Sequence, residues 1–289
     1  MKKYLVISLS LLMLVAIIVM GNSHFKKQQE NLIVVSTDKN LTKEEFTIPN
    51  DKIYVYSFNG KINIYIKGSK ENSNRYVGYH IRNFKNELNE NNSNDDLKTN
   101  YDVWNISYVD EYERRNEETF INIKNIVREG EWDLALKEEG ANDFIGGTQH
   151  GDEITTDYTL FVDGEQKEIN KMFKSDVDEL KFTATSDLYR DNSITESLEK
   201  IGTSKKTYIF DVTGLTVERE INFETDMHLE KSYLAMLPIL RDSQGEKITD
   251  TIITNIHDEE YDVSEAGFSI PEIRNIPADK VIIFGKDSG

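Results

Sequence analysis

The chain has 289 residues, no cysteine, and 52 acidic against 34 basic side chains, which gives a formal net charge of -18. A field of this sign repels nucleic acid and anionic lipid headgroups, so neither is an expected partner. The lack of cysteine excludes disulfides and thiolate metal sites, and the length is ample for a packed core.

An apolar run marks the N-terminal region. It extends from Tyr4 to Met20, follows two lysines and precedes a polar segment. About 17 residues is short for a membrane-spanning helix and long for the core of a signal peptide. We expect residues 1–21 to be a signal peptide or an N-terminal membrane anchor, and residues 22–50 to be a polar tether. An exported chain without cysteine is typical of the bacterial cell surface.

Two β-hairpins are predicted from local sequence. Residues 52–68 alternate branched or aromatic side chains with polar ones around an Asn-Gly pair, and residues 158–169 do so around an Asp-Gly pair. Both pairs favour the left-handed backbone that a tight hairpin turn requires. The predicted turns are Asn59-Gly60 and Asp163-Gly164.

The remaining elements are mostly short strands. Residues 132–136 and 280–285 are predicted as strands, and residues 214–224 alternate apolar and polar side chains with one arginine interrupting the apolar set. Residues 84–100 are strongly polar and are predicted as an exposed loop. One short helix is predicted over residues 193–202, from a Ser or Thr cap, a glutamate in its first turn and a closing glycine.

These elements predict an all-β, mainly antiparallel fold. Many short strands with Asn-Gly and Asp-Gly turns and scarcely a helix are typical of a β-sandwich or jelly roll. We expect a single domain over residues 51–289, with at most one or two short helices. A domain break near residues 170–200 is the alternative.

One polar cluster stands out at the end of a glycine turn, just before the second hairpin: His150, Gly151, Asp152 and Glu153. A histidine beside a carboxylate on a sheet can act as a general base with an orienting acid, or can bind a divalent cation. If the strand pleats regularly, His150 and Asp152 lie on the same face as Leu160, and Glu153 lies on the opposite face. The alternative is a polar strand start without a chemical role.

The spacing of His150 and Glu153 resembles the zinc-binding pair of the metallocarboxypeptidases, over these four residues alone. The resemblance implies a metal peptidase acting on peptidoglycan, with zinc held by these two side chains and a later histidine such as His257. In that family the motif leads into a helix, whereas residues 154–164 are predicted here as a strand and a turn. Residues three apart on an extended strand point to opposite faces, which argues against a shared metal.

A second segment, residues 225–241, carries further candidates and is predicted to cross the same sheet, either as part of the site or as ordinary core. If it lies beside the first segment, it adds a base, a proton donor and a cation that neutralises charge on a substrate. No G-x-S-x-G, P-loop, dinucleotide or H-E-x-x-H motif is present. The candidate catalytic residues are His150, His228 and Tyr233, and the candidate substrate-binding residues are Asp152, Glu153 and Arg241.

Two functions are compatible with these patterns. The first is an extracellular β-sandwich module of the cell surface that binds a glycan, a wall polymer or a protein. The alternative is a carbohydrate-active enzyme, a polysaccharide lyase or hydrolase, for which a divalent cation is the one cofactor considered. Proximity of His150 and His228 in a cleft favours the enzyme, and their separation favours the binding module.

Overall fold

The computed structural model describes residues 51–68, 74–86, 101–128, 134–191 and 199–236, together with five short strands between residues 242 and 284. All of them lie in one compact unit, Thr47–Gly289. Within these residues, no helix has the length and apolar character needed to cross a membrane. The predicted N-terminal segment and tether lie outside the described residues.

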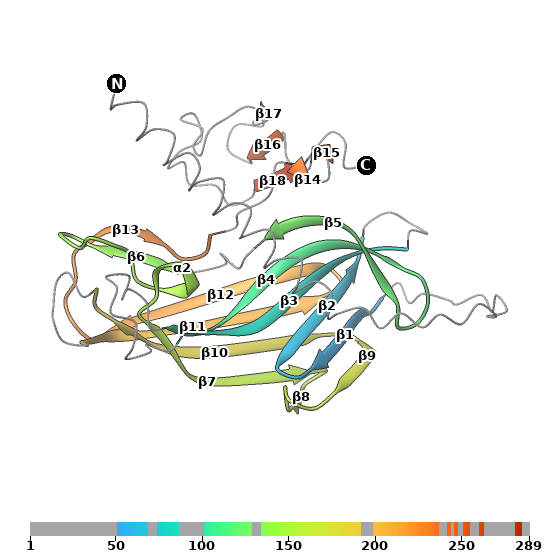
Figure 1. The fold of residues 1–289 in the computed structure, drawn as a ribbon, viewed down its shortest axis with the longest axis horizontal. Coiled ribbons are helices and arrows are strands. Elements are labelled where there is room, and N and C mark those ends of the chain that lie inside the picture. The colour runs from blue at the N-terminus through green and yellow to red at the C-terminus, as the bar shows by residue number, and fades with distance from the viewer. Residues whose placement is uncertain are drawn as a thin grey trace, which may run out of the picture. The chain divides into compact units, whose positions relative to one another are not determined.

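Eleven strands form one large sheet (Figure 1). In chain order they are β1 (Ile53–Phe58), β2 (Lys61–Lys67), β3 (Arg75–Asn86), β4 (Tyr101–Arg114), β5 (Phe120–Arg128), β7 (Glu153–Val162), β8 (Glu165–Lys167), β9 (Phe173–Val177), β10 (Leu180–Tyr189), β11 (Lys200–Asp211) and β12 (Gly214–Phe223). Their order across the sheet is β12-β11-β10-β7-β4-β3-β2-β1-β9, with β5 beside β4 and β8 beside β7. Neighbours pair antiparallel except β4 and β7, so the predicted all-β, mainly antiparallel class is confirmed.

The junction between β4 and β7 is short. These strands pair in parallel through two residue pairs only, Tyr101 with Glu153 and Asp102 with Ile154. By contrast, β3 and β4 pair along twelve residue pairs, and β10 and β11 along ten. The junction therefore divides the sheet into one half formed by β1 to β5 with β9, and another formed by β7, β8 and β10 to β12.

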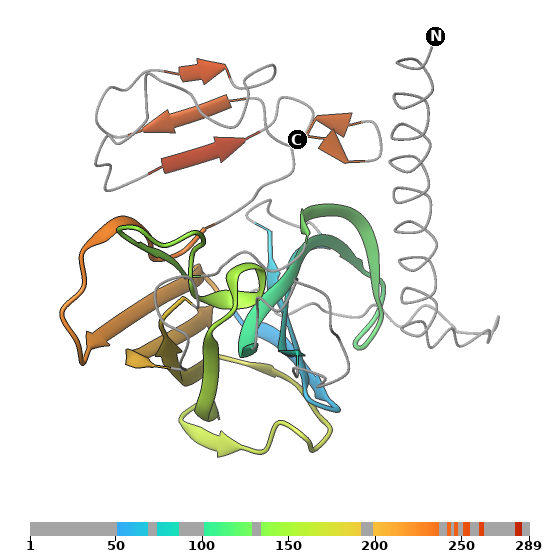
Figure 2. The same cartoon turned by 60° about the vertical axis from the view of Figure 1, so that its left-hand side comes forward.

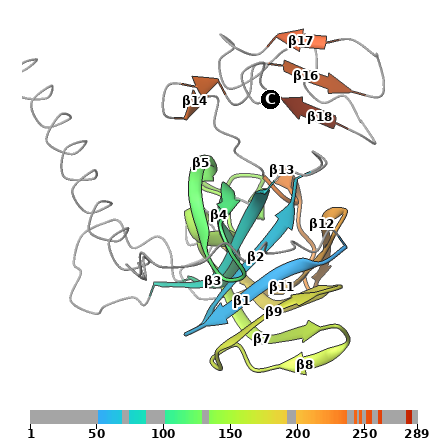
Figure 3. The same ribbon diagram turned by 90° about the vertical axis from the view of Figure 1, so that its right-hand side faces the viewer.

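One apolar core joins the two halves. Fully buried Ile64 and Ile106 from the first half belong to the same cluster as Phe182 and Phe210 from the second. The halves are also linked by the chain, because β9 pairs with β1 (Figure 3) and only two residues separate β9 from β10. The sheet therefore curves, and burial of these large side chains contributes about 1.5–3 kcal/mol each to its stability.

Both predicted hairpins are confirmed. Asn59 and Gly60 have φ of 55° and 78° and connect β1 to β2, and Asp163 and Gly164 have φ of 49° and 78° and connect β7 to β8. Positive φ at both central residues is the type I′ requirement that Asn-Gly and Asp-Gly meet at low steric cost.

The predicted helix over residues 193–202 is wrong at its C-terminal end. Lys200 begins β11, and Ile201 is buried in a second apolar cluster with Leu188 of β10. Gly202 pairs with Phe223 of β12, and a Cβ there would overlap the neighbouring strand's backbone. The glycine permits close approach of two strands instead of ending a helix. Residues 192–198 lie outside the described part of the chain.

The segment that carries His228 and Tyr233 does not join the main sheet, contrary to prediction. The strand β13 (Leu229–Tyr233) pairs with β6 (Ala135–Glu138) in a separate two-stranded sheet. Because β13 has no other partner strand in the described structure, its side chains are exposed, and the expected core packing fails at Leu234, which is 55% exposed. The predicted strand over residues 132–136 is confirmed in its described part by β6.

Short strands follow towards the C-terminus. The strands β14 (Asp242–Ser243) and β15 (Glu246–Lys247), each two residues long, pair antiparallel. A three-stranded sheet has the order β17 (Glu260–Asp262), β16 (Thr251–Thr254), β18 (Val281–Phe284), drawn in orange and red in Figure 2. The predicted strand over residues 280–285 is confirmed by β18.

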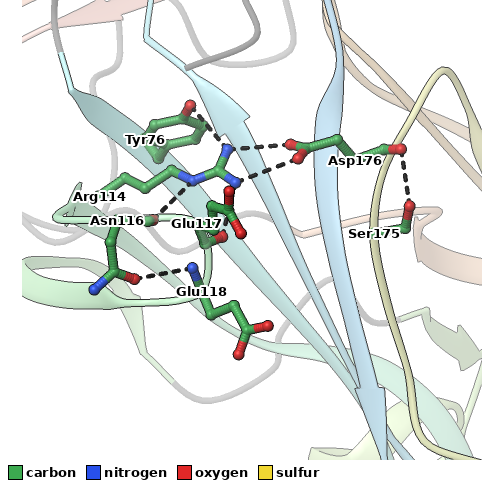
Figure 4. A network of polar contacts seen from close by, with 7 residues as sticks. All are labelled: Tyr76, Arg114, Asn116, Glu117, Glu118, Ser175 and Asp176. Atoms are coloured by element: carbon green, nitrogen blue, oxygen red, sulfur yellow. Dashed lines mark hydrogen bonds and ion pairs between the residues drawn. The ribbon is translucent and has the colours of Figure 1, made fainter. Parts of the chain in front are cut away.

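A buried arginine fixes β4 to β9 within the first half of the sheet (Figure 4). The Arg114 side chain is 1% exposed and donates hydrogen bonds to both carboxylate oxygens of Asp176, at 3.1 and 3.3 Å. It also donates to the Tyr76 hydroxyl at 3.4 Å and to the carbonyl of Glu117 at 2.8 Å. The centroid of the Phe120 ring lies 5.2 Å from the guanidinium carbon of Arg114. Every contact favours the charged arginine, so the cation is compensated although it is out of water.

Removal of the Asp176 carboxylate should destabilise the protein strongly. The Asp176→Ala variant leaves the buried Arg114 charge without its partner, which we expect to cost about 3 kcal/mol of unfolding free energy. Asp178→Ala is the matched control, because Asp178 pairs with Lys52 at an exposed site and should cost less than about 1 kcal/mol. Urea unfolding followed by circular dichroism measures both. Equal losses would show that the Arg114 network does not stabilise the fold.

Candidate functional site

Glycines shape the turn that presents His150. The helical turn α2 (Gly147–His150) lies between Gly146 and Gly151, whose φ values are 106° and 75°. The Gly146 N–H donates to the Gly151 carbonyl at 2.6 Å and closes the turn. A Cβ on Gly146 would lie 2.6 Å from the carbonyl oxygen of Leu134. Only glycine fits this position, and it allows the turn that carries His150 to pack closely against the backbone of Leu134.

His150 belongs to an aromatic cluster formed by Phe144, His150 and Tyr233. The centroid of the Phe144 ring lies 5.0 Å from that of His150 and 6.0 Å from that of Tyr233. The His150 Nδ1 atom is 3.7 Å from a carboxylate oxygen of Asp143. Tyr233 is 47% exposed, so part of the cluster faces solvent. The structure thus brings two of the predicted residues, His150 and Tyr233, to one place.

The other candidates of that segment lie elsewhere. The His228 side chain is exposed, and its carbonyl accepts a hydrogen bond from the Glu139 N–H at 2.8 Å, at the opposite end of β13 from Tyr233. A strand rises about 3.3 Å per residue, which places the two Cα atoms about 16 Å apart. His228 is therefore not part of the aromatic cluster. Arg241 and His257 lie outside the described residues.

Glu153 faces the protein interior, contrary to the prediction from a regular pleat. On β7, Asp157 pairs with Thr185 of β10, but Thr155 pairs with Ser186, so Thr156 is an extra residue. Such a β-bulge reverses the side-chain alternation beyond it. Glu153 therefore lies on the buried face of the sheet and has no exposed surface.

Asp152 occupies the surface side of the same turn. It is partly buried and has φ of 56°, a left-handed conformation that aspartate tolerates. Burial, and then the negative charges of Asp191 and Asp143, raise the pKa of its carboxyl to about 6. The carboxyl group can therefore exchange a proton close to neutral pH, two residues from His150 in sequence.

The interior carboxylate of Glu153 lies in a polar network. Its Oε2 accepts a hydrogen bond from the Gly147 N–H at 2.7 Å, and its Oε1 lies 3.8 Å from the Nζ of Lys206 on β11. The Lys206 Nζ donates to Oδ1 of Asn105 on β4 at 2.7 Å. Burial alone would raise the pKa of Glu153, but the positive charges of Lys206 and Arg219 and the Gly147 N–H outweigh it and lower the pKa. Glu153 is therefore a buried carboxylate anion.

Lys206 and Asn105 were not among the residues predicted from sequence. A signal was present on β11, where Ser204, Lys206, Tyr208 and Phe210 share one parity of the strand and all four are buried. A lysine on the buried parity of a strand requires a polar partner inside. No local pattern identifies that partner, because Asn105 lies 101 residues away.

His80 on β3 is held in a second network and is not available for catalysis. Its Nδ1 lies 2.6 Å from Oδ1 of Asn63, and its Nε2 lies 2.8 Å from the Tyr112 hydroxyl. Burial, and then the charge of Arg82, lower the pKa of His80 to about 4, so the ring is neutral at pH 7. The Nδ1–H then donates to Asn63, and the single O–H of Tyr112 is shared between Nε2 and the Asp110 carboxylate, whose oxygen lies 3.3 Å away.

The zinc pair implied by the metallocarboxypeptidase resemblance does not fit this site. His150 is partly exposed next to Asp143, whereas Glu153 points inward to Gly147 and Lys206. Across the residues that the structure describes, no three His, Asp or Glu side chains are arranged to hold a metal ion.

No protein-family model, curated protein or solved structure matches this chain. Function is therefore inferred from the geometry and chemistry of the site.

The raised pKa of Asp152 predicts a pH-dependent stability change. The folded-state pKa of about 6 exceeds the ordinary value of 3.8, so the folded state binds the proton more tightly. Its stabilising contribution is present below about pH 4 and is lost as pH rises through 6. Asp152→Asn should therefore be more stable than the wild type at pH 7, by on the order of 1–2 kcal/mol, and equally stable near pH 4.

Urea unfolding at the two pH values measures this difference. Asp157→Asn, an exposed position on the same strand, is the control and should change stability by less than about 0.5 kcal/mol. A loss of stability in Asp152→Asn at pH 7 would mean that the carboxylate makes a favourable contact in the folded protein.

Proposed function

We propose that this chain is an exported β-sandwich module of the cell surface that binds a glycan on the aromatic cluster of Phe144, His150 and Tyr233. The observation that carries the proposal is the half-exposed Tyr233 ring beside Phe144, which in turn contacts His150. Aromatic rings offer a flat apolar surface on which the C–H face of a sugar packs, and adjacent polar groups orient its hydroxyls.

The charge around the cluster supports a neutral sugar or an amino sugar. Asp143 lies beside His150, and the charges of Asp143 and Asp191 reach Asp152. Asp143 is placed to accept hydrogen bonds from hydroxyls, and the negative charges together attract an ammonium group and repel a uronate. The net charge of -18 acts in the same direction at longer range.

The fold and composition support the other parts of the proposal. The single core shared by the two halves of the main sheet supports a sandwich architecture. The apolar run near the N-terminus and the absence of cysteine support export to a bacterial surface. We propose contact with the membrane through the N-terminal segment alone.

Substitution of the exposed ring should remove binding without unfolding the protein. Tyr233→Ala is expected to weaken glycan affinity at least tenfold, because a central aromatic contact contributes about 1.4 kcal/mol or more. Its melting temperature should change little, since the ring is half exposed. Phe58→Ala removes an aromatic side chain that is also half exposed, at a turn of the main sheet, and serves as the control.

Calorimetry with neutral, amino-sugar and uronate oligosaccharides measures these affinities. We expect binding of the first two classes, loss with Tyr233→Ala and no change with Phe58→Ala. Absence of binding across all three classes, or an equal loss in both variants, would contradict the proposal.

A carbohydrate-active enzyme is a second proposal, supported by the carboxyl of Asp152, which has a pKa of about 6 and lies two residues from His150 in sequence. Incubation of the same oligosaccharides with the protein tests it. New reducing ends would indicate a hydrolase, and the absorbance of an unsaturated uronate would indicate a lyase. In either case His150→Ala should abolish product formation, whereas intact oligosaccharides after prolonged incubation would support binding alone.

A further inference from the structure

Three polar side chains meet inside the protein, each from a different strand of the main sheet. They are Asn105 of β4, Glu153 of β7 and Lys206 of β11, with exposed fractions of 0, 0 and 1%. Lys206 crosses from the second half of the sheet to the first, and its Nζ lies 2.7 Å from Oδ1 of Asn105. This contact holds an amine against a carboxamide at a site from which solvent is excluded.

The geometry favours a reaction between these two groups. A nucleophile held in hydrogen-bond contact with an acyl group reacts at an effective concentration far above any attainable in solution. Burial also removes the water that would solvate the amine and compete for the acyl carbon. Aromatic side chains extend this dry environment, since Tyr208 is fully buried next to the site and stacks with Phe182.

Glu153 is placed to carry the proton. Its Oε2 is held by the Gly147 N–H, whereas its Oε1 has no hydrogen bond of good geometry among the described residues and lies 3.8 Å from the Lys206 Nζ. The nearby Ser186 hydroxyl helps to lower the pKa of this carboxyl. An anionic carboxylate with an uncommitted oxygen beside an ammonium group can take the proton that must leave before the amine attacks. The Tyr208 hydroxyl lies 3.5 Å from the Asn105 Oδ1 and can donate to it.

We propose that Lys206 and Asn105 form an intramolecular isopeptide bond, with Glu153 as the proton carrier. Glu153 removes a proton from the Lys206 ammonium, and the free amine attacks Cγ of Asn105. The C–N bond to Nζ forms, the bond from Cγ to Nδ2 breaks, and the protonated Glu153 returns its proton to the departing nitrogen. As the tetrahedral adduct breaks down, Nζ loses a second proton, which converts the departing ammonia to NH4⁺. One ammonium plus one carboxamide therefore give one amide plus NH4⁺. No oxidant or cofactor is required.

The position of the bond in the fold gives it a structural role. The two halves of the sheet pair directly through only two residue pairs, between β4 and β7. A covalent bond from β4 to β11 spans this junction and closes a segment of 101 residues. In a chain without cysteine it supplies a cross-link of the kind that disulfides provide elsewhere.

Mass spectrometry of the purified, folded wild-type protein tests the proposal. After proteolysis, the peptides that contain Asn105 and Lys206 should be recovered as one branched species, lighter than their sum by one ammonia, about 17 Da. The boiled chain should also migrate faster in a denaturing gel than an unlinked variant, because a closed segment keeps it more compact. Two separate peptides of unmodified mass from the folded wild type would overturn the proposal, since they would show a hydrogen bond alone.

Variants assign the roles of the three residues. Lys206→Arg cannot form the bond and should give the unlinked mass. Lys205→Arg, at the exposed neighbouring position, should retain the isopeptide bond and give the branched species. Glu153→Gln retains the size of the side chain but cannot take the proton, and should also be unlinked. A branched species in Glu153→Gln would overturn the role of Glu153, and a mass lowered by one water would overturn Asn105 as the partner. The wild-type peptides decide the existence of the bond even if a variant does not fold.

Discussion

The architecture depends on how the two halves of the main sheet are held together. Among the described strands, the two halves pair only through the short parallel contact of β4 with β7, while every strand within a half pairs along most of its length. Cohesion must therefore come from side chains that cross the interior. Isoleucines of β1 to β4 packed against phenylalanines of β10 and β11 provide the apolar part of that contact.

Buried ions at two places in the sheet give this core its specificity. Arg114 with Asp176 joins β4 to β9, and Lys206 with Asn105 joins β11 to β4. Such groups cost free energy to desolvate and satisfy their hydrogen bonds in only one arrangement of the strands. They therefore disfavour alternative strand registers, in which a buried charge would lose its hydrogen bonds, and the placement of Lys206 is also the basis of the proposed isopeptide bond.

The turn around α2 connects the interior and the surface. The Gly147 N–H holds the Glu153 carboxylate inside the sheet, and three residues later His150 packs on Phe144 near the exposed Tyr233. A bulge at Thr156 makes this division possible, because it turns Glu153 inward while Asp152 remains on the surface side. One short acidic stretch thus contributes to both the core network and the proposed glycan face.

Local features of the fold could be predicted from the sequence alone. Turn chemistry and period-two alternation were sufficient for both hairpins, for β12 and for the mainly antiparallel class, because Asn-Gly and Asp-Gly turns restrict the backbone wherever they occur. His150 and Tyr233 were also selected, since histidines and clustered aromatic residues are visible in the chain. The bulge at Thr156, the pairing of β13 with β6 and the contact of Lys206 with Asn105 are visible only in the folded chain. These are choices among distant partners, and their free energy depends on the packing of the whole core, which no local window of sequence contains.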